Sequence, residues 1–187
     1  ANGIKGAFFA TTRHLGRNLL WHDLLMLFEQ HALPAEKEKF VSMLAECALS
    51  DNNHVMTIEE KLKYLSLDKR LPLLEFLRKK VSSFIKEPLM MTENELIDLE
   101  KQGHVVGAHT RNHPILSLES PQVARYEIEE DVKILSSILN NKVKAFAYPN
   151  GKPNKDYGSE HLKILQQLEI DYAVSTAPGY FEAGSDP

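Results

Sequence analysis

Apolar residues along the chain follow two alternating spacings. Short runs rich in β-branched and aromatic residues, each ending at a turn or a polar loop, are typical of buried strands. Such runs occupy residues 4–11, 104–109, 143–148 and 171–176. The segments between them repeat apolar residues at the spacing of an amphipathic helix. Alternation of this kind predicts an α/β fold with parallel strands and crossover helices, arranged as an open sheet or an incomplete barrel.

Several helix starts are marked by capping residues. Thr57 and Thr92 are each followed three residues later by Glu, the arrangement of a capping box. Ser120 precedes Pro121, a favourable N-cap and first-turn pair, and predicts a long helix through residue 139. Ser159 is predicted to open the last helix, over residues 160–168.

The stretch from residue 18 to residue 86 differs from the rest. It contains helical patterns, the first over residues 18–31, and no strand signal. We predict a helical insertion, a small subdomain or lid, within a single domain that covers residues 1–187.

Composition and charge narrow the class of protein. The 187 residues are 43% hydrophobic and 26% charged, which are ordinary globular values, and the formal net charge is −4. An acidic balance argues against a nucleic-acid partner. The single Cys47 excludes an internal disulfide framework and a multi-cysteine zinc site. We expect a soluble chain without a signal segment and without a membrane span, which needs about 18 apolar residues.

The most informative chemistry lies after the second predicted strand. His109 and His113 are four residues apart, a spacing at which two neutral imidazoles can bind one metal ion. Pro114 disfavours helix at His113, so a strand that ends in a tight loop is the better interpretation. Thr110 is a candidate for orienting a ligand histidine within this loop. Ligand sites of parallel α/β folds collect at such strand ends.

The third predicted strand also runs into a turn. Tyr148, Pro149 and Asn150 lead to Gly151, which permits positive φ. Such a turn can hold a backbone N–H group in the direction that an oxyanion hole requires, although an ordinary β-turn has the same composition.

Five segments together resemble the polysaccharide deacetylase family, carbohydrate esterase family 4. "GHVVGAHTRNHPILS" resembles the second motif of the family and "AFAYPNG" its third. "NGIKGAFFATT" is similar to the strand after the first motif, and "LMMTENELIDLEKQGH" to the helix that leads into the second. "LEIDYAVSTAPGY" resembles a late strand of the pattern.

The resemblance implies a deformed (β/α) barrel and metal-dependent removal of acetyl groups from a carbohydrate. It implies a divalent metal, most often zinc, held by His109, His113 and an aspartate. That aspartate and its neighbour, the general base, belong to an Asp-Asp pair expected upstream of Ala1. The late catalytic histidine of the family has no match, since His161 lies too early in the pattern. The turn at Tyr148, Pro149 and Asn150 would supply the oxyanion donor.

The third motif departs from the common family pattern. Ala147 stands where many members have Arg, and Asn150 stands where an aromatic residue is usual. Two alternatives therefore stay open beside the deacetylase. One is a catalytically silent carbohydrate-binding relative, and the other is an amidohydrolase that cleaves a non-peptide C–N bond of a small molecule.

Overall fold

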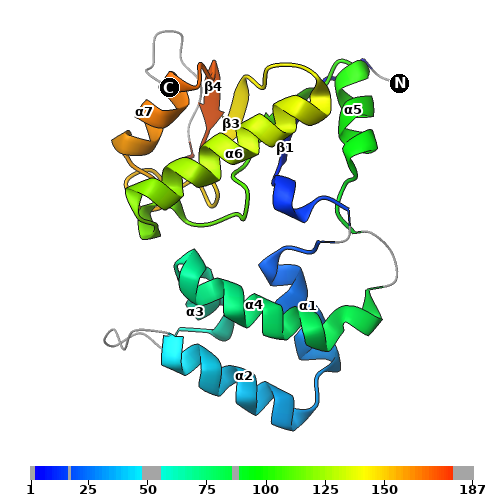
Figure 1. Ribbon diagram of the computed structural model, residues 1–187, viewed down its shortest axis with the longest axis vertical. Coiled ribbons are helices and arrows are strands. Elements are labelled where there is room, and N and C mark those ends of the chain that lie inside the picture. Colours follow the sequence, from blue (N-terminus) through cyan, green and yellow to red (C-terminus); the bar gives the residue numbers. More distant parts are fainter. Residues whose placement is uncertain (1–2, 17, 48–55, 86–88, 179–187) are drawn as a thin grey trace. The chain divides into compact units, whose positions relative to one another are not determined.

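The computed structural model describes residues 3–16, 18–47, 56–85 and 89–178, and its chain forms two compact units (Figure 1). The α/β unit comprises residues 1–16 and 91–187, and the helical unit comprises residues 17–90. Each unit has its own hydrophobic core, so each is described by itself.

The α/β unit is built on a parallel sheet. Its strands are β1 (Ala7–Ala10), β2 (Val105–Ala108), β3 (Ala145–Ala147) and β4 (Tyr172–Val174). They pair in the order β1-β2-β3-β4, and every neighbouring pair is parallel. The α/β class and the parallel strands are therefore confirmed. Within the described residues the sheet is open, and each strand is shorter than its predicted run.

The prediction that all four strands are buried is wrong for the two at the edges. Phe8 on β1 and both Tyr172 and Val174 on β4 are exposed. Among the described strands, β1 and β4 each pair with one neighbour, which leaves much of their surface uncovered. In contrast, every residue of β3 is buried, as are the last three of β2.

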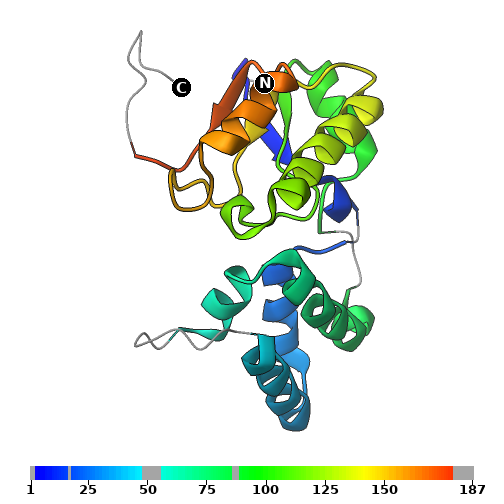
Figure 2. The same ribbon diagram turned by 60° about the vertical axis from the view of Figure 1, so that its left-hand side comes forward.

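Helices α5 (Glu93–Lys101), α6 (Pro121–Leu139) and α7 (Ser159–Gln167) pack around the sheet (Figure 2). Helix α6 contacts β2, α5 and α7, and the core includes Leu96, Ile128 and Phe146. Short 3-10 turns, η1 (Thr12–His14) and η3 (Leu116–Leu118), follow the first strand and the histidine loop.

The capping signals of the α/β unit are mostly confirmed. The Thr92 capping box is formed, and the Ser120 side chain accepts the Val123 N–H at the start of α6. The prediction that Ser159 opens the last helix needs correction, because the N-cap residue is Gly158. His161 explains the difference, since its Nδ1 accepts the Gly158 N–H at 2.9 Å.

The helical unit consists of α1 (Trp21–His31), α2 (Pro34–Cys47), α3 (Ile58–Lys63) and α4 (Leu67–Val81), with η2 (Ser82–Phe84) after them. The Thr57 capping box is formed at the start of α3. Helix α1 starts at Trp21, not at residue 18 as predicted. The core of the helical unit contains leucines together with Phe28 and Phe40. None of the described helices in either unit has the length and apolar character needed to cross a membrane.

Candidate metal and oxyanion site

The loop after β2 brings the two predicted histidines together. His109 directly follows the strand, and Thr110 and His113 both take positive φ, 64° and 54°, so the chain reverses within a few residues. The imidazole rings of His109 and His113 meet edge to face, with centroids 4.7 Å apart and an interplanar angle of 75°. Their proximity comes from the loop's backbone, because no helix places them on a common face.

A carbonyl group on the adjacent strand fixes the protonation of His109. Its Nδ1 lies 2.7 Å from the carbonyl oxygen of Ala147. A carbonyl can only accept, so Nδ1 carries the proton and Nε2 presents a lone pair. Burial lowers the pKa of His109, which favours the neutral ring. A neutral imidazole whose other nitrogen is held in this way is the form that binds a metal ion.

Asp131 on α6 binds the backbone directly after β2. One carboxylate oxygen accepts the His109 N–H at 2.8 Å, and the other accepts the Thr12 N–H at 2.8 Å. The side chain thereby joins the carboxyl ends of β1 and β2. Burial raises the pKa of Asp131 to about 6, while the hydrogen bonds from Thr12 and His109 act in the opposite direction.

Glu127, one turn earlier on α6, holds the other end of the loop. Its carboxylate accepts the Asn112 N–H and the Asn112 side-chain amide, both at 2.7 Å. Asn112 immediately precedes His113. Asp131 thus binds His109 at the start of the loop. Glu127 binds Asn112, which is next to His113 at its end.

Thr110 lies at the centre of the same loop and is completely buried. Its hydroxyl oxygen has no hydrogen-bond partner among the residues that the structure describes. The side chains that accept hydrogen bonds from the loop are instead those of Asp131 and Glu127. The orienting role that we predict for Thr110 stays a prediction.

The turn after β3 offers one backbone donor. The Tyr148 N–H is used by the Val174 carbonyl at 3.2 Å, and Pro149 has no N–H. The Gly151 N–H donates back to the Pro149 carbonyl at 2.7 Å, across Asn150 with its φ of 59°. The Asn150 N–H has no partner within the described part of the chain. Among the residues of the predicted oxyanion turn, the available donor is therefore Asn150.

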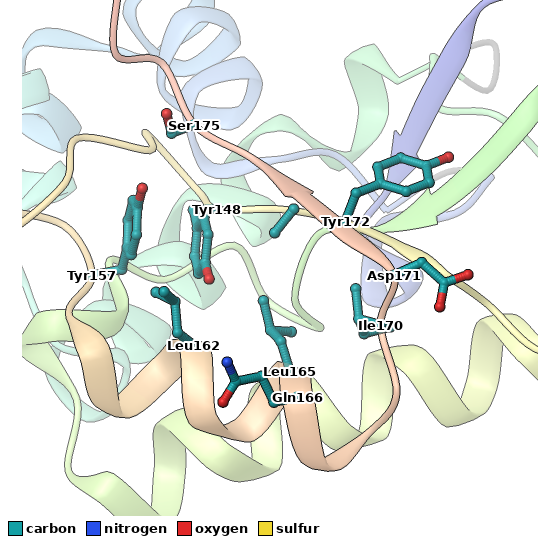
Figure 3. Close-up of a pocket in the computed structure, with 10 residues that line it drawn as sticks. Tyr148, Tyr157, Leu162, Leu165, Gln166, Ile170, Asp171, Tyr172 and Ser175 are labelled. Atoms are coloured by element: carbon teal, nitrogen blue, oxygen red, sulfur yellow. The ribbon is translucent and has the colours of Figure 1, made fainter. Parts of the chain in front are cut away.

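The Tyr148 side chain points away from this chemistry. Its ring stacks on Tyr157, with centroids 3.6 Å apart, and burial raises the pKa of its hydroxyl (Figure 3). The stacked pair lines a pocket of about 160 Å³ against α7 and β4. None of the residues that line this pocket belongs to the 109–113 loop. In the turn, Tyr148 therefore has a structural role through its ring.

Asp131 and Glu127 are not among the site residues that the sequence predicts. A signal for them exists, because both fall in the apolar register of α6, beside Ala124, Ile128 and Leu135. Acidic side chains in a buried helical register are unfavourable unless they are hydrogen-bonded. Such residues therefore mark a place where backbone donors approach the helix.

The two histidines provide imidazole nitrogens, which are ligand atoms that zinc binds in proteins. Both are imidazoles of one loop, their rings are in contact, and His109 presents Nε2. In the part of the chain that the structure describes, no group of three or more His, Cys, Asp or Glu residues is arranged to hold a metal ion. A complete zinc site needs at least a third protein ligand.

Comparison with known proteins identifies a family whose model matches most of the chain. Residues 1–173 match the family model described as polysaccharide deacetylase. A putative polysaccharide deacetylase of Bacillus subtilis (strain 168), YxkH, is 25% identical over 89 residues, which are 48% of this chain and 30% of the relative. The match thus spans less than a third of that protein.

Among solved structures, the Streptococcus pyogenes deacetylase PplD in complex with acetate is 17% identical, with a TM-score of 0.45. The alignment covers 94% of this chain and 84% of that one. IcaB from Ammonifex degensii is 15% identical, with a TM-score of 0.42, and the alignment covers 92% and 84% of the two chains.

Proposed function

Because the chain belongs to the polysaccharide deacetylase family, we propose that its gene product is a metal-dependent hydrolase that removes acetyl groups from a carbohydrate. The observation that carries the proposal is the paired imidazoles of His109 and His113 at the end of β2. The lone pair at His109 Nε2 supports a role as a ligand, because the proton of the ring is on Nδ1, which donates it to the Ala147 carbonyl.

In this proposal His109 and His113 would hold a divalent metal ion, with zinc as the expected ion, together with the aspartate that the family resemblance implies. When bound, such an ion polarises an acetyl carbonyl and lowers the pKa of a water molecule. His109 Nδ1 keeps its proton and donates it to the Ala147 carbonyl throughout, which keeps the ring neutral and its orientation fixed.

The Asn150 N–H is the proposed oxyanion donor. Attack on an acetyl carbonyl places negative charge on its oxygen, and a fixed backbone donor stabilises that charge. The donor is pre-oriented because Asn150 lies inside the tight turn closed by the Gly151 N–H and the Pro149 carbonyl. The carbonyl of Asn150 is held as well, since it accepts the Thr176 hydroxyl at 2.6 Å. Donation from the backbone makes the role independent of the Asn150 side chain.

The test is the metal content of the full-length gene product and of two variants. We expect about one equivalent of zinc in the wild type and its loss in His109→Ala. The matched control is His22→Ala, which removes an exposed histidine of the helical unit and should leave the metal in place. Full metal content in His109→Ala would contradict the proposed ligand.

Activity is tested on the same samples by acetate release from an acetylated glycan. The wild type and His22→Ala should release acetate, and His109→Ala should not. A wild type that binds metal and glycan without releasing acetate would favour the silent relative. A wild type that opens cyclic amides and spares acetylated glycans would favour the small-molecule amidohydrolase.

A further inference from the structure

Helix α6 carries two carboxylates on the face that it buries. Asp131 is fully buried and Glu127 is 2% exposed, and the two are one helical turn apart. Taking a carboxylate out of water is unfavourable, and an apolar residue of similar size often stabilises a core more. Stability alone therefore gives little reason for two buried carboxylates one helical turn apart.

Their hydrogen bonds converge on one short segment. Asp131 receives the N–H of His109 and also that of Thr12, whereas Glu127 receives two donors from Asn112. The Arg111 N–H donates to the backbone carbonyl of Glu127 at 3.1 Å, so the helix backbone adds a further anchor. Consecutive parts of the loop are thus held by one turn of α6.

The loop needs such anchors because its backbone is unfavourable on its own. Thr110 and His113 both occupy the left-handed region, which a β-branched residue such as threonine rarely adopts, although histidine adopts it more readily. Such conformations persist where the surroundings over-determine them. The two carboxylates supply that determination, and the result is the close approach of the two imidazoles.

We infer that Asp131 and Glu127 are positioning residues that fix the His109 and His113 imidazoles for metal binding. The inference rests on the proposed function, because it assigns both histidines as ligands. Asp131 acts on His109 through its main chain and aligns it with the end of β1. Glu127 acts on His113 through the preceding Asn112.

The decisive variants are Asp131→Asn and Glu127→Gln, which preserve shape. An amide has one accepting oxygen, so in Asp131→Asn the new NH2 group would face one of the two N–H donors. The variants thereby remove hydrogen bonds without opening a cavity. Glu130→Gln is the control. It removes a carboxylate from the same helix, and the ion-pair partner of that carboxylate is the exposed Lys133.

The measurement is cobalt(II) affinity of the full-length protein, by competition with a chromophoric chelator, together with the visible spectrum of bound cobalt. We expect Asp131→Asn to lose about 10- to 100-fold in affinity and Glu127→Gln about 10-fold. The spectrum of the folded, loaded variants should also shift, because ligand geometry sets it. Glu130→Gln should match the wild type in both respects.

A merely structural role gives a different result. It predicts lower melting temperatures of the metal-free variants, with unchanged cobalt affinity and spectrum in the folded protein. That outcome would overturn the inference while leaving the metal assignment intact. If Asp131→Asn does not fold, Glu127→Gln decides in the same way. A folded wild type that binds no cobalt would overturn the proposed function, and the positioning role with it.

Discussion

The loop after β2 and the turn after β3 end adjacent parallel strands, yet different atoms hold them. Side chains hold much of the histidine loop, since the carboxylates of Asp131 and Glu127 receive its N–H groups, while main-chain bonds of Arg111 add to them. Main-chain groups largely hold the turn, through the Gly151 N–H to the Pro149 carbonyl and the Thr176 N–H to the Gly151 carbonyl. The loop should therefore respond to changes on α6, and the turn to changes in its backbone.

The largest effect is expected at Gly151, where the turn depends on a residue without a side chain. Gly151 has a φ of 69°, and an added Cβ would lie 2.9 Å from the Thr176 backbone nitrogen. Gly151→Ala should therefore lower the free energy of unfolding by about 3 kcal/mol, measured by urea denaturation.

Gly16→Ala is the matched control for that change. Gly16 has a φ of 72° and nothing within 4 Å of an added Cβ. It should lose only the conformational part, about 1 kcal/mol. Equal losses in the two variants would contradict the close approach at the turn.

The next largest effect is expected at His161, whose side chain caps the start of α7. His161 Nδ1 accepts the Gly158 N–H at the start of α7, and burial lowers the pKa of His161. Glu160, 3.3 Å away, and the Leu116 main chain oppose that shift in the pKa of His161. A histidine with a lowered folded pKa contributes stability above its ordinary value of 6.5, and loses it as pH falls through the folded pKa.

His161→Gln tests this pH dependence. Glutamine at the third helical position can accept the same N–H without titrating. Below pH 6.5 the wild type should lose about 1 kcal/mol that the variant keeps, seen as a steeper fall of the wild-type melting temperature. Parallel curves for the two proteins from about pH 8 to about pH 5 would show that protonation of His161 does not affect the cap.

A smaller effect is expected at Thr110 in the histidine loop. A buried hydroxyl without a partner is unfavourable, and valine has nearly the same shape. Thr110→Val should therefore raise the free energy of unfolding by about 0.5 kcal/mol in urea denaturation. A loss of stability instead would reveal a hydrogen bond of this hydroxyl. Cobalt affinity of the same variant tests the predicted orienting role of Thr110.

The sequence predicted what depends on local pattern. The parallel strands, the capping boxes at Thr57 and Thr92, and the long helix from Pro121 to Leu139 all follow from residues near one another in the chain. Strand lengths were overestimated because apolar runs continue past the ladder into loops. The exposure of β1 and β4 depends on sheet order, which local periodicity does not contain.

The candidate site divides in the same way. The spacing of His109 and His113 and the turn at Pro149 were visible in the sequence, since each lies within a few residues. The hydrogen bond from His109 to Ala147 joins residues 38 apart, and that from His109 to Asp131 joins residues 22 apart. Only the fold brings such partners together. The choice of Asn150 as donor likewise required knowing which N–H groups of the turn were already used.

The smallest effect is expected at Asn150, the residue whose backbone we assign as the oxyanion donor. Asn150→Ala removes the side chain and keeps the N–H, and the turn bonds on either side involve main-chain atoms of Pro149 and Gly151. The rate of acetate release should stay within about threefold of the wild type, because loss of a true oxyanion donor costs about 100-fold or more. Asn150→Gly, which relieves the positive φ, should behave alike. A loss of about 100-fold in both variants, with the turn intact by amide exchange, would mean that the Asn150 side chain takes part in the reaction.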